Sequence, residues 1–262
     1  MAANTLYQYS TASALMAGVA SHGIPLSRLL SHGNHGLGTM AFINGEVVLL
    51  DGTAYHLHPS GSIRIAEGHE ELPFAMVTPF NDARKKWATF AEGLCNKSAV
   101  FDCLSRLMYP EEAKNQNHFA FFLVSDALFD SITVRVVRSQ QYPNQPLAEL
   151  GDAQKVDCYR GVRGCLVGFW SPMFMDGVCV GGLHMHFLSQ DRTFGGHVLE
   201  LEARGAVSMT AAVLHHFHLE LPVNEEFDNA RLGGGGEALH KVEVQEKHRG
   251  YWSEITIYSN SR

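Results

Sequence analysis

The sequence predicts an α/β fold of the α+β type, with mixed β-sheets arranged in two domains. Its 262 residues are 45% hydrophobic, which is enough apolar material for one large core or two smaller ones. The first half contains strands separated by turn dipeptides, and the second half contains strands interrupted by glycine. We place the boundary near residue 128, between a mixed α/β domain over 1–128 and a β-rich domain over 129–262.

The N-terminal domain begins with a predicted short helix over residues 5–19. Ser10 or Thr11 can cap this helix, and its small residues allow close packing. A loop rich in glycine and histidine follows at 31–38.

A three-stranded meander is the clearest β pattern in the chain. Its strands are predicted over 38–43, 46–50 and 53–58. The dipeptides between them, Asn44-Gly45 and Asp51-Gly52, are preferred in two-residue hairpin turns because both central positions need a positive φ.

The elements after the meander are less sharply marked. Residues 82–108 are predicted to be helical with breaks, and the four glycines at 233–236 form a flexible linker before a short helix at 237–245. Further strands are predicted over 118–125, 132–137, 161–170, 177–188 and 196–202.

Composition excludes several classes of partner. The formal net charge is −7 and no basic run is interleaved with aromatic residues, so nucleic acid is not an expected partner. No apolar stretch approaches about 20 residues, so no membrane span is expected. Charged residues make up only 18% of the chain, which indicates extensive burial, in the core or against a partner subunit.

The N-terminus and the cysteines indicate a cytoplasmic protein. The first residues lack a basic region and a clear cleavage site, so they are expected to be part of the fold. The five cysteines are odd in number, widely spaced and without a Cys-x-x-Cys pair, as is typical of reduced thiols.

Three histidines in the C-terminal half have the spacing of a metal site. His184 and His186 share one face of a strand, because alternate residues of a strand point the same way. A glycine-rich turn then brings His197 back on an antiparallel strand beside them. Three imidazoles converging at ~2.0–2.1 Å leave an ion its full charge and an open position, as Lewis-acid catalysis requires.

Two other interpretations of this pattern remain open. A cupin-type metal dioxygenase or isomerase also begins its site with His-x-His, but the glutamate expected about four residues later is replaced here by Gln190, and the nearest acid is Asp191. A non-catalytic module that binds a small ligand would hold no metal tightly.

The remaining histidines are not expected to bind a metal. No strand or helix aligns His215, His216 and His218 on one face. His32 and His35 lie in a glycine-rich loop, where a structural or supporting role is expected.

Four segments resemble the acetolactate decarboxylase family. They cover most of residues 5–245 in the same order, and the second and fourth together are highly specific. The segments are LYQYSTASALMAGV, HGNHGLGTMAFINGEVVLLDGTAYHL, ITVRVV and GLHMHFLSQDRTFGGHVLE. The resemblance implies a two-domain α/β fold, a zinc ion on the three histidines, a homodimer, and conversion of 2-acetolactate to (R)-acetoin and CO2.

The resemblance also implies further active-site residues. Matched by motif position, they are Thr39 and Glu46 of the meander and Arg135 of the ITVRVV strand. The family has a glutamate near its C-terminus, and Glu243 fits that place, with Glu246 and Glu254 as alternatives in the longer tail of this chain.

These residue types suit the implied reaction. Acetolactate is a β-keto acid, so its own ketone accepts the electron pair released with CO2, and zinc can stabilise the resulting oxyanion. Arg135 can hold the carboxylate with its planar fork, and Glu46 can donate or relay the proton that quenches the enediolate. Without the resemblance, the three residues would equally suit an exposed strand arginine, a solvated carboxylate and an ordinary strand threonine.

Overall fold

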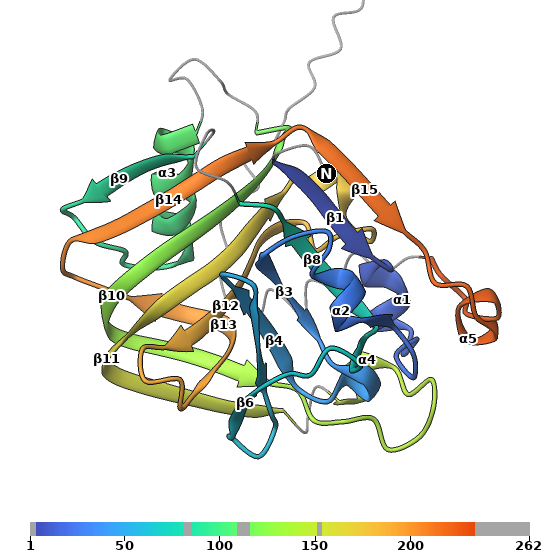
Figure 1. Ribbon diagram of the computed structural model, residues 1–262. Coiled ribbons are helices and arrows are strands. Elements are labelled where there is room, and N and C mark those ends of the chain that lie inside the picture. Colours follow the sequence, from blue (N-terminus) through green and yellow to red (C-terminus); the bar gives the residue numbers. More distant parts are fainter. Residues whose placement is uncertain (1–3, 81–84, 109–115, 151–153, 234–262) are drawn as a thin grey trace, which may run out of the picture.

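The computed structural model describes residues 4–80, 85–108, 116–150 and 154–233. Two large β-sheets dominate the fold (Figure 1). Short helices connect the strands: α1 (Ala12–Met16), α2 (Leu26–Leu29), η1 (Ala41–Ile43), α3 (Lys97–Met108), α4 (Leu147–Leu150), η4 (Met173–Met175) and α5 (Glu225–Asp228).

The first sheet has seven strands in the order β15-β1-β8-β3-β4-β5-β6. Only β15 and β1 run parallel within it; the other pairings are antiparallel. Its strands are β1 (Thr5–Tyr9), β3 (His35–Thr39), β4 (Glu46–Leu50), β5 (Thr53–Leu57), β6 (Ile63–Ile65), β8 (Phe74–Thr78) and β15 (His216–Glu220). A separate small ladder joins β2 (Ile24–Pro25) to β7 (Glu71–Leu72).

The second sheet has six strands in the order β11-β12-β13-β10-β14-β9, and β10 also pairs with β11. Strands β10, β11, β12 and β13 therefore form a closed ring of pairings. The long green and yellow ribbons of β10 and β11 run together through most of the molecule (Figure 1). The strands are β9 (Lys86–Phe90), β10 (Phe119–Val136), β11 (Lys155–Ser171), β12 (Gly182–Ser189), β13 (Gly195–Glu202) and β14 (Val207–Leu214).

The two sheets pack against each other through one apolar core. Leu37 and Val48 of the first sheet join Phe121, Phe169 and Leu188 of the second in this inter-sheet layer. Because side chains alternate along a strand, Glu46 faces the same layer as Val48, and His186 faces the same layer as Leu188. Polar residues at these positions are therefore held inside the inter-sheet layer.

Two further cores cover the outer faces of the sheets. Helix α3 packs Val100 and Leu104 against the second sheet, where Phe187 points away from the inter-sheet layer. Helix α2 packs Leu26 and Leu29 against the first sheet.

Several predicted elements differ from the structure near the N-terminus. The helix predicted over 5–19 is wrong in its first part, where β1 fills the segment between β8 and β15. Tyr7 is fully buried there, and the Thr, Tyr and Tyr of this segment favour a strand, so the prediction extended the helix too far toward the N-terminus. The helix itself is only α1, and Thr11 caps it as expected, accepting a hydrogen bond from Ala14 N at 3.1 Å.

The second and third strands of the meander are confirmed as β4 and β5, but the first is displaced, because β3 begins at His35 within the predicted 31–38 loop and ends at Thr39 instead of 43. Asp51 and Gly52 have φ of 50° and 79°, as a two-residue hairpin requires. The first turn is wider than predicted, because β3 ends at Thr39 and the segment Met40–Gly45 forms η1 and a bend.

The later elements are longer or different from those predicted. The segments 118–125 and 132–137 form one strand, β10, with a bulge between Val124 and Ala127. The predicted helical stretch 82–108 contains β9 before α3. Strand β11 begins earlier than 161, β12 begins later than 177, and β13 agrees with prediction.

Two sequence-based expectations remain predictions. Residue 128, the proposed domain boundary, lies within β10, and β15 from the second half pairs with β1 in the first sheet. The helix predicted at 237–245 lies outside the described residues.

Candidate metal centre between the sheets

The three predicted histidines converge. His186 on β12 lies directly opposite His197 on β13, and His184 is two residues from His186 on the same face. One nitrogen from each ring lies within 4.8 Å of the others. The ring centroids are 5.1 to 5.6 Å apart, and all three side chains are buried. Among the described residues, this is the one group of histidine, cysteine and acidic side chains close enough to hold a metal ion.

The turn between β12 and β13 is held by its own polar side chains. Ser189 N donates to Phe194 O at 2.9 Å, which closes the loop. The Asp191 carboxylate accepts from the Ser189 and Thr193 hydroxyls at 2.8 Å each, and these hydrogen bonds lower its pKa. Asp191 is thus engaged in the turn and does not join the histidine group, so it does not supply the acid that the cupin interpretation expects shortly after His-x-His.

Glycines allow the hairpin to approach its neighbours. A Cβ on Gly195 would lie 2.3 Å from the Phe187 carbonyl oxygen and 2.4 Å from Leu57 Cδ2. A Cβ on Gly196 would lie 2.5 Å from the Arg135 carbonyl oxygen. The glycine pair before His197 therefore lets β13 fit closely between β12, β10 and the first sheet.

A backbone carbonyl fixes the tautomer of His186. Its Nδ1 donates to Val47 O of β4 at 2.9 Å, so the proton lies on Nδ1 and the Nε2 lone pair is available. Nε2 makes no hydrogen bond and lies 3.6 Å from Glu46 Oε2. This buried nitrogen has no hydrogen bond and belongs to one of the three converging rings, as expected of a metal ligand.

Burial favours the neutral form of His186 and His197. Desolvation lowers the pKa of His186 well below its ordinary value, and nearby His184 lowers it further. Desolvation also lowers the pKa of His197 well below its ordinary value, and the positive charge of Arg135 lowers it further. Neutral imidazole is the form that coordinates metals, so the donor set fits a divalent ion such as zinc.

Two rows of side chains face each other across the inter-sheet layer. On the second sheet, Arg135 of β10 is paired with His197, which is paired with His186. On the first sheet, Thr39 of β3 is paired with Glu46 of β4. The contacts of His186 with β4 bring the two rows together.

The structure thus places Arg135, Glu46 and Thr39 beside the histidine group. Arg135 is only 1% exposed and lies close enough for its charge to lower the pKa of both His186 and His197. Glu46 is buried, and the Thr39 hydroxyl donates to Gly45 O at 2.7 Å. The catalytic roles of these residues stay predictions, and Glu243, Glu246 and Glu254 lie outside the described residues.

Sequence reasoning missed part of the lining of the layer. Leu57 is paired with Glu46, and Phe74 is paired with Thr39 and stacks near His184 with a centroid distance of 6.5 Å. Leu57 ends the meander segment and Phe74 lies outside the four segments, and only the strand register places both residues here. The Val47 carbonyl also carries no signal in the sequence, because every residue has one.

The other histidines have structural surroundings. His32 stacks on Tyr7 at 3.7 Å, and His35 packs edge-on against Phe80 and Phe121. His218 lies near Tyr7 with a centroid distance of 5.2 Å. Among the described residues none of them joins the metal group.

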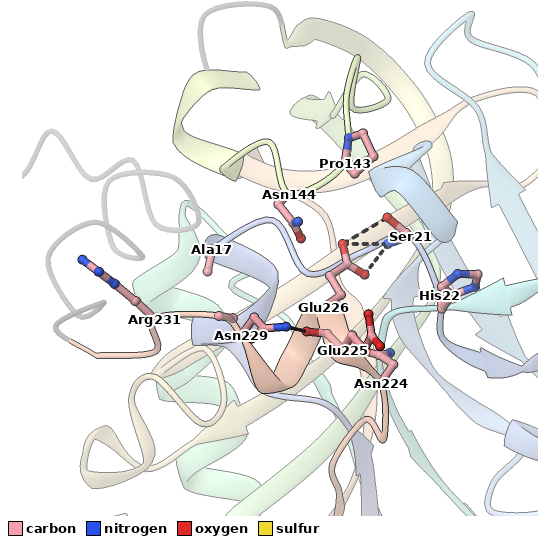
Figure 2. Close-up of a pocket in the computed structure, with 11 residues that line it drawn as sticks. Ala17, Ser21, His22, Pro143, Asn144, Asn224, Glu225, Glu226, Asn229 and Arg231 are labelled. Atoms are coloured by element: carbon pink, nitrogen blue, oxygen red, sulfur yellow. Dashed lines mark hydrogen bonds between the residues drawn. The ribbon is translucent and has the colours of Figure 1, made fainter.

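A cavity of about 660 Å³ lies elsewhere, between the end of α1, the loop after β10 and α5 (Figure 2). None of the three metal-group histidines lines it. Figure 2 shows the Glu226 carboxylate directed at Ser21, and it accepts from Ser21 N, Ser21 Oγ and Ala20 N at 3.0 to 3.4 Å. This contact attaches α5 to the loop after α1.

Within the described residues, no helix is long and apolar enough to cross a membrane.

Comparison with known proteins gives one consistent family. The family model described as alpha-acetolactate decarboxylase matches residues 6–234. The alpha-acetolactate decarboxylase of Methanosarcina mazei is 36% identical over 247 residues, which covers 92% of this chain and 81% of that protein. The enzyme of the same name from Klebsiella aerogenes is 31% identical, covering 87% and 84% of the two chains.

Solved structures agree with this result. The crystal structure of alpha-acetolactate decarboxylase from Bacillus subtilis has a TM-score of 0.83 at 27% identity, covering 92% of this chain and 99% of that one. A Staphylococcus aureus protein described as similar to alpha-acetolactate decarboxylase has a TM-score of 0.81 at 30% identity, covering 92% and 100%. With the family model spanning most of the chain, these matches show that the protein belongs to the alpha-acetolactate decarboxylase family.

Proposed function

We propose that this protein is a carboxy-lyase that converts 2-acetolactate to (R)-acetoin and CO2, using a zinc ion held by His184, His186 and His197. The single observation that supports the metal site is the buried Nε2 of His186, which has no hydrogen bond while the other nitrogen of the same ring donates to Val47 O, in a ring that converges with His184 and His197. Membership of the family supports the reaction.

The electron flow of the reaction sets what the protein must supply. The bond between the substrate carboxylate and its neighbouring carbon breaks, CO2 leaves, and the electron pair moves through the carbon chain onto the ketone oxygen. A bound zinc ion would supply Lewis-acid stabilisation of the charge that develops on this oxygen. A proton must then be added to the carbon that lost CO2.

Arg135 is proposed to orient the substrate. Its guanidinium is buried in the inter-sheet layer beside His197, where a planar fork can hold a carboxylate in a fixed direction. Holding the carboxylate also places the breaking bond relative to the ketone, which lowers the entropy lost on reaching the transition state.

Glu46 is proposed to deliver the proton. It faces the histidine group from the opposite sheet, with Oε2 3.6 Å from His186 Nε2. A single donor on one side of the flat enediolate protonates one face, which accounts for a product of one handedness. Thr39 is proposed to support Glu46, since its hydroxyl donates to the carbonyl of Gly45 next to it.

One experiment tests the reaction. The purified protein is incubated with racemic acetolactate, acetoin and CO2 are measured, and the metal content of the same preparation is determined by mass spectrometry. We expect stoichiometric acetoin and CO2 and about one zinc per chain. Absence of acetoin from a folded, metal-loaded protein would overturn the proposal, and iron content with oxygen uptake would favour the cupin-type alternative.

We also propose a homodimer, supported by the family resemblance in the sequence, and a cytoplasmic location, supported by the odd number and wide spacing of the cysteines. Sedimentation velocity would test the first and fractionation of the source cells the second.

A further inference from the structure

The polypeptide that carries Glu46 into the inter-sheet layer has an unusual backbone. Between β3 and β4, Phe42 and Ile43 both have left-handed conformations, with φ of 59° and 55°. Ile43 is β-branched and buried, and such residues adopt this conformation only where their surroundings require it. The position of Glu46 therefore depends on what holds Met40–Gly45 in place.

Hydrogen bonds from three other segments hold this loop. Phe42 N donates to Ala20 O at 2.6 Å, and Gln140 N donates to Phe42 O at 2.8 Å. His56 Nε2 of β5 donates to Asn44 O at 2.6 Å. These contacts hold the main chain at Phe42, within the left-handed pair, and at Asn44, directly after it.

One further hydrogen bond, between two side chains, joins the loop before β4 to the segment after β10. The Ser139 hydroxyl donates to Asn44 Oδ1 at 2.7 Å. Asn44 lies two residues before Glu46, and Ser139 lies four residues after Arg135 on the chain that leaves β10. The bond therefore connects the proton donor's strand in the first sheet with the carboxylate-binding strand in the second.

We propose that Asn44 and Ser139 are positioning residues that set Glu46 relative to Arg135. The inference rests on the proposed function, in which Arg135 fixes the substrate and Glu46 protonates one face of the enediolate. Neither residue touches the substrate in this scheme. Their effect arises because the donor and the bound carboxylate must keep one relative position, and a shift of about 1 Å from a remote change can cost on the order of a hundredfold in rate.

The product itself gives a readout that a merely structural role would not change. A displaced Glu46 lets water protonate the enediolate from either face, so the enantiomeric ratio of the acetoin falls. A variant that is only less stable yields less active enzyme, but each remaining molecule makes product of the original ratio. The ratio therefore separates positioning from loss of folded protein.

The test compares Ser139→Ala, Asn44→Ala and the double variant with wild type on acetolactate. We expect each single change to lower kcat by about tenfold, with a smaller change in KM, unchanged metal content and acetoin of lower enantiomeric purity. The double variant should be no worse than the poorer single variant, because both changes remove the same bond. Asn44→Asp keeps an acceptor oxygen and should restore most of the rate and the ratio.

Ser13→Ala is the matched control. Its hydroxyl donates to Gly177 O at 2.9 Å in a similarly half-buried place, but it has no contact with the loop before Glu46. It should leave kcat and the enantiomeric ratio unchanged.

The outcomes that overturn the inference are distinct from failure of the proposed function. An active wild type with unaltered kcat and ratio in Ser139→Ala overturns the positioning role alone. So does an equal effect of Ser13→Ala. A wild type that makes no acetoin overturns the proposed function, and the positioning role with it. If Asn44→Ala does not fold, the results with Ser139→Ala and Asn44→Asp still test the positioning role.

Discussion

The β12–β13 hairpin and the β3–β4 connection both deliver polar side chains into the inter-sheet layer, but by different means. In the hairpin, His186 and His197 meet because they are direct partners in a regular ladder. In the connection, Glu46 follows a loop in which Phe42 and Ile43 are left-handed. The hairpin is locally self-consistent, whereas the loop is held by contacts with distant segments.

The two regions depend on different interactions to keep their conformations. A left-handed residue costs roughly 1–2 kcal/mol, so the loop persists only because tertiary hydrogen bonds outweigh this cost. The histidines need the strand register, the glycines that allow close packing, and one main-chain contact with β4, from His186 to Val47 O. We therefore expect metal binding to withstand changes in the loop, while proton delivery should be sensitive to them.

Removing a hairpin ligand should have the largest effect. His186→Ala, like His184→Ala or His197→Ala, should lose nearly all zinc and turnover, because a site of two protein ligands binds far more weakly than one of three. Metal content by mass spectrometry checks this. His216→Ala is the control and should keep its full zinc content. Full zinc occupancy in all three ligand variants would show that these histidines do not hold the metal.

Changing the residue delivered by the loop should spare the metal. Glu46→Gln keeps the shape of the side chain but cannot transfer a proton, so kcat should fall by roughly 10²–10⁴-fold. The protein should fold and retain zinc, as circular dichroism and metal analysis would show. Near-normal turnover would give Glu46 a structural role instead.

Arg135 shares a row with the histidines, and its variants test whether the fork matters as well as the charge. Arg135→Lys should bind zinc normally and lose at least about tenfold in kcat/KM, because lysine keeps the charge without the planar geometry. Arg135→Ala should be worse. We expect kcat to fall and KM to rise. If Arg135→Lys keeps wild-type kcat/KM, the residue that binds the carboxylate should be sought at Arg163 or Arg138.

The smallest effect is expected from the bond that closes the base of the loop. Thr39→Val removes the donor to Gly45 O while keeping the side-chain shape, and should lower the free energy of unfolding by about 1 kcal/mol. Thr39→Ser keeps the hydroxyl and is the control. Urea denaturation of both variants measures the difference, and equal stabilities would show that the bond contributes nothing.

The same contrast explains what the sequence could predict. The spacing of His184 and His186 and the glycines before His197 encode the hairpin locally, and Asp51-Gly52 likewise encodes its turn. Asn44-Gly45 has the same local signature, yet its turn is wider, because Ala20 and Gln140 bind the loop from far away in the chain.

Long-range pairing also explains the other differences. The segment Thr5–Tyr9 is too short to reveal that it lies between two partners in a sheet, and β15 has no local signal for its parallel pairing with β1. The two rows across the inter-sheet layer depend on the register of five strands, which no single motif records.

The hydrogen bond from His186 to Val47 has an evolutionary consequence. The acceptor is a main-chain oxygen, which every amino acid supplies, so no replacement at position 47 can delete it. The protonation pattern of this ring is therefore inherited with the fold rather than with a particular side chain. The side chain at position 47 answers only to the apolar core on the outer face of its sheet, and a substitution that keeps this packing leaves the acceptor for His186 in place.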